Sequence, residues 1–242
     1  MGNQHPILLA SECDITFFVP CYNEEDNVIR TFESIVGAAT EVGVSYEILV
    51  VDDKSQDNTV GVIEDYVEAN PEIQMTIVKN EKNLGLGRNY VEGAYISKGE
   101  HYMLVNGDNA EPRETIVAII EKLGQADMII PFFGRGDTRK LGRRAISAVF
   151  TKLVNLLSGQ SLRYYNGPVA HLKFNIMRWH ADTDGYGYQA EILTRLLEGG
   201  ASYIEVAVPN YDRGSGVTKA FSVKNFLAVG HSLSQIFLRR IR

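Results

Sequence analysis

Three segments of the sequence place acidic or amide side chains directly after an apolar run. They are Cys21-Tyr22-Asn23-Glu24, Asp52-Asp53 and Asn106-Gly107-Asp108-Asn109. Because carboxylates repel phosphates, acids that serve an anionic ligand need a cation between them and that ligand. Mg²⁺ and Mn²⁺ bind through oxygen, and they often take few protein ligands in addition to the phosphates of a substrate. The pattern therefore predicts that Asp108 anchors a hard divalent ion.

The apolar runs before these segments are typical of buried strands. We expect strands at 15–19, 47–51, 75–80, 101–105 and 127–133, alternating with helices over short connections. Such alternation predicts an α/β fold with a doubly wound, mostly parallel sheet and helices on both faces. Ligands of these sheets bind at the carboxyl ends of the strands, where the three polar segments should meet.

The second half of the sequence is less regular. A basic segment, "RGDTRKLGRR", precedes an expected helix at 145–157, and the cluster "RYYNG" follows it. A helix around "GYQAEILTRLLEGG", a strand in "YIEVAVPNY" and the segment "DRGSGVTK" come next. The residues from 221 to 242 have helical periodicity with a basic end, which suits either packing on the domain or contact with an anionic membrane surface.

Composition excludes several classes of protein. The 242 residues carry a formal net charge of −6, which argues against a nucleic-acid partner. Two cysteines, Cys13 and Cys21, are too few for a disulfide framework, so a reducing cytoplasm is expected. We see no secretory leader and no apolar run long enough to span a bilayer, since Lys152 interrupts the best one.

Four motifs together resemble those of a known family. "PCYNEEDNV", "VVDDKSQDNT", "NLGLGRNYVEGAYISKGEHYMLVNGDN" and "DRGSGVTK" are similar, in order and spacing, to the motifs of inverting family 2 glycosyltransferases with the GT-A fold. The subgroup that they resemble most is the polyprenyl-phosphate (dolichol-phosphate) hexosyltransferases. The resemblance implies a single GT-A domain over 1–242. Its nucleotide-sugar half would cover about 14–135, its acceptor half about 136–220, and an amphipathic helix about 221–242.

The resemblance also implies roles for individual residues. The nucleotide-sugar site would contain Pro20, Tyr22, Glu24, Asp52, Asp53, Gly85, Arg88, Asn106, Gly107, Arg135, Arg143 and Gln189. Asp53 would accept a hydrogen bond from the nucleobase, and Asp108 with Asn106 would hold Mg²⁺ or Mn²⁺. Arg213 and Lys219 would close over the diphosphate or the lipid phosphate. Glu191 and Asp184 are the candidates for a general base.

The sequence departs from the family pattern at two places in the metal motif. Asn106 stands where the family has its first aspartate, and Ala110 replaces a polar residue. Asn109 and Glu111 are therefore alternative contributors to metal binding. Thr218 replaces a serine in the lysine motif, which is a mild change.

Structural alternatives exist for most of these residues. Asp52 and Asp53 could cap the following helix, with Asp57 or Asn58 as other caps, and Asp108 could be an ordinary turn residue. The basic residues Arg135, Arg139, Arg143, Arg144, Arg213 and Lys219 could form a solvated surface. The aromatic cluster 164–167 could be core, pocket wall or a sugar contact.

The predicted function is transfer of a hexose, with inversion, from a UDP- or GDP-sugar to an acceptor. The resemblance favours polyprenyl phosphate as the acceptor, in a cytoplasmic protein that can contact the membrane peripherally. Two alternatives stay open. One is transfer to a sugar hydroxyl in cell-surface polysaccharide synthesis, and the other is a nucleotide-sugar binding module without catalysis.

Overall fold

The computed structural model describes residues 11–134, 141–178, 187–209 and 223–240. The strands are β1 (Cys13–Cys21), β2 (Tyr46–Asp52), β3 (Met75–Lys79), β4 (Gly99–Leu104), β5 (Met128–Phe133), β6 (Ala170–Leu172) and β7 (Tyr203–Val208). The helices are α1 (Val28–Val42), α2 (Thr59–Ala69), α3 (Leu86–Ile96), α4 (Arg113–Ile120), α5 (Leu141–Ser158), α6 (Lys173–Arg178), α7 (Tyr188–Glu198) and α8 (Val223–Arg240). The five predicted strands of the first half are confirmed.

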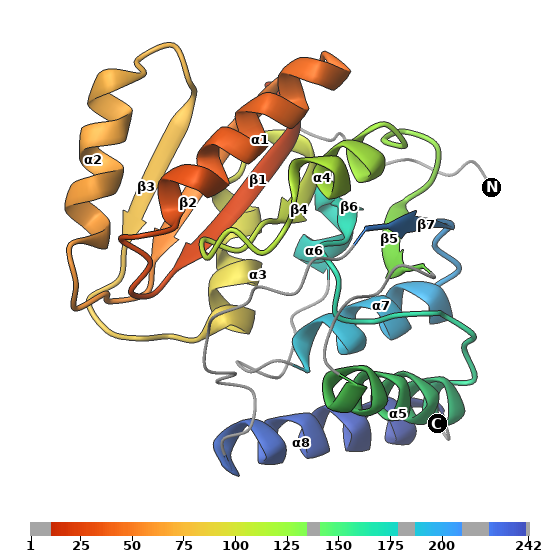
Figure 1. The fold of residues 1–242 in the computed structure, drawn as a ribbon. Coiled ribbons are helices and arrows are strands. Elements are labelled where there is room, and N and C mark those ends of the chain that lie inside the picture. The colour runs from red at the N-terminus through yellow and green to blue at the C-terminus, as the bar shows by residue number, and fades with distance from the viewer. Residues whose placement is uncertain (1–10, 135–140, 179–186, 210–222, 241–242) are drawn as a thin grey trace.

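The seven strands form one sheet in the order β3-β2-β1-β4-β6-β5-β7 (Figure 1). β1 pairs in parallel with both β2 and β4, and β5 pairs in parallel with β7. β6 is antiparallel to its neighbours β4 and β5. The prediction of a mostly parallel α/β sheet is thus confirmed, but the antiparallel strand was not predicted, because three residues are too few to show a periodicity.

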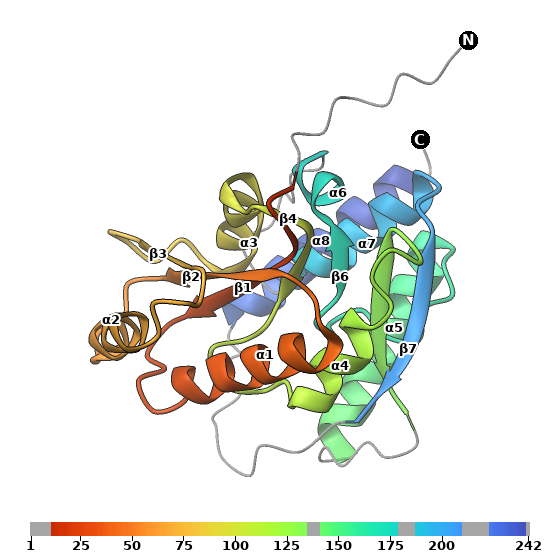
Figure 2. The ribbon, with the colours of Figure 1, turned by 90° about the horizontal axis from the view of Figure 1, so that it is seen from above.

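Helices cover both faces of the sheet, as Figure 2 shows from above. On one face, β1 residues Phe17 and Val19 pack with α1, α2 and α4. On the other face, Phe18 packs with α3, α5, α6, α7 and α8. Because successive side chains of a strand point to opposite faces, an uninterrupted apolar run such as that of β1 supplies both cores.

α8 packs on the domain in part. The Ile236 side chain is fully buried in the core on the α3 side of the sheet, whereas Phe237 and Leu238 are exposed. In the described ranges of the chain, no helix combines the length and the hydropathy needed to cross a bilayer.

Candidate active site

The polar segments that follow β1, β2 and β4 meet at the carboxyl edge of the sheet. Cys21 at the end of β1 lies opposite Asp52 at the end of β2. Burial raises the pKa of the Cys21 thiol well above its ordinary value, and the charges of Glu24, Asp52, Asp108 and Asp57 raise it further. Because β1 pairs with both β2 and β4, and Gly107 donates to the Pro20 carbonyl, the three polar segments lie at one edge of the sheet, as predicted.

Gly107 allows the loop after β4 to approach β1 closely. Its backbone N–H donates to the Pro20 carbonyl over 3.3 Å. A Cβ at position 107 would lie 2.8 Å from the Cys21 sulfur and 2.9 Å from the Pro20 oxygen, with Glu24 on the same side. A side chain at this position would collide with β1, so glycine is the residue that fits.

Two hydroxyl residues of α1 hold the same loop. The Thr31 hydroxyl lies 3.2 Å from the Asn106 carbonyl and 3.1 Å from the Gly107 carbonyl, and it accepts the Asn109 N–H over 3.0 Å. The Ser34 hydroxyl donates to the Asn109 side-chain oxygen. Asn109 has a left-handed backbone with φ of 54°. The hydrogen bond from Ser34 places its side-chain oxygen on the α1 side of the loop, and a role of Asn109 in metal binding stays a prediction.

Glu111 is bound to Asn106 at two points. The Asn106 backbone N–H donates to Glu111 Oε2 over 2.9 Å, and the Asn106 side-chain NH₂ donates to Glu111 Oε1 over 2.8 Å. Glu111 is 9% exposed. Both of its oxygens thus accept hydrogen bonds from Asn106, so Glu111 supports the loop, and its contribution to metal binding stays a prediction.

The Asp53 carboxylate ties β2 to the glycine-rich loop before α3. It accepts the backbone N–H groups of Leu84 and Gly85, over 2.8 and 2.9 Å, and the Asn80 amide over 2.9 Å. Gly85 has φ of 89°, a backbone conformation that favours glycine. Burial alone would raise the pKa of Asp53, but these hydrogen bonds lower it below the ordinary value. Hydrogen bonding to a nucleobase stays a prediction for this side chain.

Asp52 and Asp53 do not cap α2. The N-cap residue is Asn58, whose side chain makes no capping hydrogen bond, and the preceding Asp57 accepts the Thr59 backbone N–H through Oδ1 over 3.0 Å. Asp52 accepts the Ser55 N–H through Oδ2, while its buried Oδ1 has no hydrogen-bond partner among the described residues. Buried acceptor atoms normally have a hydrogen-bond partner, so a bound ligand or ion at this edge of the sheet would satisfy the Asp52 Oδ1 atom.

The loops after β1 and β2 are joined by reciprocal hydrogen bonds. Asn23 accepts from Gln56 N–H and donates its own N–H to the Ser55 hydroxyl, while Glu25 accepts from Asn58 N–H. Asn23 and Lys54 have positive φ angles of 59° and 71°. Such backbone conformations persist where the surroundings hold them, and they often occur at functional sites.

The donor set fits a hard divalent ion that shares its coordination with a ligand. Among the described residues, no group of three or more His, Cys, Asp or Glu side chains could hold a metal by itself. Asp108 and the side-chain oxygen of Asn106 would supply one carboxylate and one amide oxygen, at the same edge of the sheet as Glu24 and Asp52. Mg²⁺ in particular is bound by one or two carboxylates plus substrate phosphates and water.

The predicted acceptor helix is α7, and its two motif residues are buried. Gln189 donates from its amide to the Gly167 carbonyl. Glu191 is completely buried and pairs with Arg195, one turn along the helix, at 2.9 Å. Tyr188 is buried as well, against Tyr90. In this structure the side chains of Gln189 and Glu191 therefore support the fold around Gly167 and α7.

The basic candidates lie in different places. Arg88 forms an exposed ion pair with Glu92 on α3, at 2.6 Å. Arg143 is exposed in the first turn of α5. Four predicted site residues, namely Arg135, Asp184, Arg213 and Lys219, lie outside the described residues.

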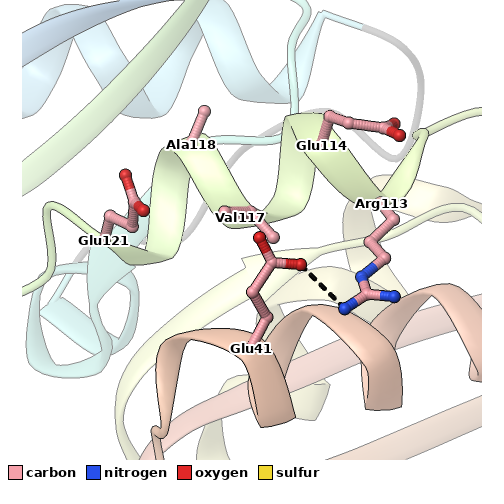
Figure 3. Close-up of a pocket in the computed structure, with 6 residues that line it drawn as sticks. All are labelled: Glu41, Arg113, Glu114, Val117, Ala118 and Glu121. Carbon is pink, nitrogen blue, oxygen red and sulfur yellow. Dashed lines mark ion pairs between the residues drawn. The ribbon is translucent and has the colours of Figure 1, made fainter.

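The aromatic cluster is core and pocket wall, as predicted. Tyr165 is fully buried and its hydroxyl donates to Asn155 Oδ1 over 2.7 Å. Tyr164 contacts Phe133 edge to face and lines a hollow beside α5. A second hollow lies between α1 and α4 (Figure 3), where Arg113 pairs with Glu41 at 2.7 Å. None of the predicted site residues lines this second hollow.

Thr31, Ser34 and Asn80 are site residues that the sequence did not single out. Each is an ordinary polar residue of a helix or loop, and its partner lies between 27 and 78 positions away. No local pattern indicates such partners. The asparagines of "KNEKNLG" offered the one available signal, because amides next to a glycine-rich loop often bind backbone groups.

Comparison with known proteins agrees with this geometry. The family model for glycosyl transferase family 2 matches residues 16–182, which is more than half of the chain. The chain therefore belongs to glycosyl transferase family 2.

Two curated relatives illustrate the subgroup. A dolichyl-phosphate beta-glucosyltransferase of Trichomonas vaginalis is 32% identical over 109 residues, covering 43% of this chain and 32% of the relative. An undecaprenyl-phosphate 4-deoxy-4-formamido-L-arabinose transferase of Edwardsiella ictaluri is 23% identical over 151 residues, covering 62% of this chain and 46% of the relative. The aligned segments thus span less than half the length of either relative.

Solved structures support the GT-A fold. Glucosyl-3-phosphoglycerate synthase from Mycobacterium tuberculosis, in complex with UDP, superposes with a TM-score of 0.67 at 16% identity, over 93% of this chain and 80% of that one. A mannosyltransferase from Pyrobaculum calidifontis, in complex with GDP-mannose and Mn²⁺, superposes with a TM-score of 0.61 at 15% identity, over 93% and 70%.

Proposed function

We propose that this chain is a metal-dependent, inverting hexosyltransferase that moves a sugar from a UDP- or GDP-sugar to polyprenyl phosphate. The observation that carries the proposal is that the segments bearing Glu24, Asp52 and Asp108 meet next to Cys21 at the carboxyl edge of the sheet. Such a concentration of negative charge suits a divalent cation with an anionic ligand on it. The subgroup of the curated relatives supports the lipid phosphate as acceptor.

In this proposal, different residues bind the metal ion, the nucleoside and the phosphates. Asp108, with Asn106, would hold Mg²⁺ or Mn²⁺, which supplies positive charge to the departing nucleoside diphosphate when bound. Pro20, Tyr22 and Asp53 would line the nucleoside pocket. Thr31 and Gly107 keep the Asp108 loop against β1, so that the charge is fixed before the ligand arrives. Arg213 and Lys219 would bind phosphate oxygens from the segment that follows β7.

The environment of Glu191 supports a phosphate acceptor over a hydroxyl acceptor. A hydroxyl must lose its proton to a base that can reach it. Glu191 is fully buried and paired with Arg195, which does not suit that task. A lipid phosphate is already ionised and needs no base, so a phosphate acceptor is consistent with this burial, while Asp184 stays the candidate base for a hydroxyl acceptor.

An exposed apolar stripe supports peripheral membrane contact, and it lies mainly on α5. The α5 stripe consists of Ile146, Val149, Leu153 and Leu156, which are 51%, 66%, 37% and 71% exposed. Their spacing of three or four residues places them on one side of the helix. The prediction from sequence placed this contact on the C-terminal helix alone, where Phe237 and Leu238 are exposed large apolar residues.

The charges of α5 and α8 suit an anionic lipid surface. The two helices contain six of the 24 lysines and arginines of the chain and none of its 30 aspartates and glutamates. Apolar side chains flanked by basic ones are typical of helices that lie in the plane of a membrane surface. We propose that this side of the molecule contacts the membrane that carries the polyprenyl phosphate.

Product formation tests the proposed function. The purified protein is incubated with Mn²⁺ or Mg²⁺, a panel of UDP- and GDP-hexoses, and either polyprenyl phosphate in detergent or soluble saccharides. The expected product is a polyprenyl phosphohexose, formed only with metal. Transfer to saccharides alone would point to the hydroxyl-acceptor alternative. Donor binding without turnover on any acceptor would point to a binding module, and absence of donor binding would overturn the proposal.

A further inference from the structure

Asn106 and Glu111 contact each other through a hydrogen bond whose direction matters. The Asn106 NH₂ group donates to Glu111 Oε1 over 2.8 Å, and the Asn106 backbone N–H donates to Glu111 Oε2 over 2.9 Å. We infer that Glu111 is a positioning residue which fixes the end of the Asn106 amide that is offered to the cation. This inference rests on the proposed function and concerns the asparagine that departs from the family pattern.

The two ends of an amide are chemically different. The NH₂ group donates hydrogen bonds, whereas the carbonyl oxygen accepts them and binds cations. Because both Glu111 oxygens act as acceptors here, the NH₂ end of Asn106 must face Glu111. The carbonyl oxygen is then the end that Glu111 leaves for a metal. The second hydrogen bond fixes the backbone, so that the amide has one preferred orientation.

This arrangement explains why asparagine suits position 106 in this chain. A carboxylate at 106 would place one acceptor against another at about hydrogen-bond distance, in a loop where Glu111 is largely buried. Like charges at that separation repel, and low exposure strengthens the repulsion. We therefore expect an aspartate at position 106 to destabilise the loop as long as residue 111 is a glutamate.

Two single substitutions and their combination separate this explanation from simple loss of structure. Asn106→Asp introduces the repulsion. Glu111→Gln offers an NH₂ group to Asn106, so the Asn106 amide turns over and presents its own NH₂ to the cation. In Asn106→Asp with Glu111→Gln, the new glutamine can accept the backbone N–H and donate to the new aspartate. Both hydrogen bonds are then restored, one with reversed direction, and a carboxylate oxygen faces the metal.

The experiment measures two quantities for the parent, both single variants and the double variant. The first is Mn²⁺ binding in the presence of UDP, and separately GDP, by electron paramagnetic resonance titration. The second is the thermal midpoint without metal or nucleotide. Glu114→Gln is the matched control, because Glu114 is an exposed glutamate three residues away on α4.

We expect Glu111→Gln to bind Mn²⁺ at least tenfold more weakly than the parent, because the turned amide presents NH₂ to the cation, and the double variant to recover to within about threefold. The thermal midpoint should fall by about 3 °C or more in Asn106→Asp and recover in the double variant. Parental Mn²⁺ affinity in Glu111→Gln, or a double variant that binds Mn²⁺ no better than Glu111→Gln, would overturn the inference. If the parent fails to bind Mn²⁺ both with UDP and with GDP, the proposed function fails. The thermal midpoints then still show whether Glu111 stabilises asparagine over aspartate at position 106.

Discussion

The Asp53 carboxylate holds the backbone of Gly85, which lies 32 residues further along the chain, through a hydrogen bond of 2.9 Å to Oδ2. The neighbouring Leu84 N–H binds the other oxygen, Oδ1. One side chain at the end of β2 thus fixes the start of α3 and the glycine-rich loop in front of it. The stability of this contact should depend on the charge of Asp53.

We expect Asp53→Asn to lower the free energy of unfolding at pH 7 by about 1–3 kcal/mol, because backbone donors lose a charged acceptor. Since the folded-state pKa of Asp53 is lowered, its contribution is complete above the unfolded value of about 4 and is lost as the pH falls through the folded value. Urea titrations between pH 7 and pH 3 should therefore show a steeper loss below pH 4 in the parent than in the variant. Parallel curves would contradict this account.

Gly107→Ala should destabilise the protein by about 1–3 kcal/mol, because the new methyl group would overlap the Cys21 sulfur and the Pro20 carbonyl. Gly142→Ala is the control. A Cβ at position 142 meets nothing within 4 Å, and alanine in a helix is favoured by roughly 0.5–1 kcal/mol. Chemical denaturation of both variants checks the prediction. It fails if the two substitutions change the free energy of unfolding in the same direction.

Asp108→Asn should lower kcat/KM for transfer at least about a hundredfold, because the substitution removes the carboxylate that we assign to the metal. Its thermal midpoint should stay near that of the parent. Asp26→Asn changes an exposed aspartate in the loop after β1 and should leave transfer unaffected. Transfer by Asp108→Asn at the parental rate would remove the basis of the proposed metal site.

Glu191→Gln should destabilise the protein by about 3 kcal/mol, since it leaves the Arg195 charge without its buried carboxylate. Transfer to polyprenyl phosphate, measured per folded molecule at low temperature, should persist. Glu92→Gln breaks another pair of the i,i+4 type, Arg88 with Glu92, which is about half exposed and should cost less than about 1 kcal/mol. Complete loss of transfer in a stable Glu191→Gln protein would instead favour a general base.

The α5 stripe should control binding to membranes. We expect Val149→Glu with Leu156→Glu to weaken binding to vesicles that contain anionic lipid by tenfold or more, because two apolar side chains no longer enter the lipid and two negative charges oppose it. Ile96→Glu is the control, since Ile96 is 53% exposed at the end of α3. Vesicle co-sedimentation at low and moderate salt measures the effect. Equal binding by the parent and the double variant would refute the α5 surface.

Much of the fold could be predicted because its central strands β1, β2 and β4 are buried on both faces. Runs such as that of β1 are continuously apolar, and the polar residues after them mark the carboxyl edge of the sheet. β6 could not be predicted, because its three residues form a strand only through β4 and β5 on either side. Its existence depends on tertiary contacts and leaves no local pattern.

The sequence predicted the acidic residues of the candidate site, but it did not predict the residues that hold their loops in place. Asp52, Asp53 and Asp108 stand out because carboxylates follow apolar runs. Thr31 and Ser34 do not stand out, since their partners are about 75 residues away. Glu191 was assigned from its motif as an acceptor-side residue. Its i,i+4 spacing from Arg195 could have indicated the ion pair, but burial could not be inferred from spacing alone.

The position of β6 has a consequence for folding of the chain during its synthesis on the ribosome. β3, β2, β1 and β4 are adjacent in the sheet and are all complete by Leu104, so this half can assemble early. The outer edge of β4 stays unpaired until β6, which begins at Ala170, has been synthesised at about 5–20 residues per second. For several seconds the nascent chain carries a bare strand edge, which is the kind of surface that chaperones shield and that pairs wrongly with neighbouring chains.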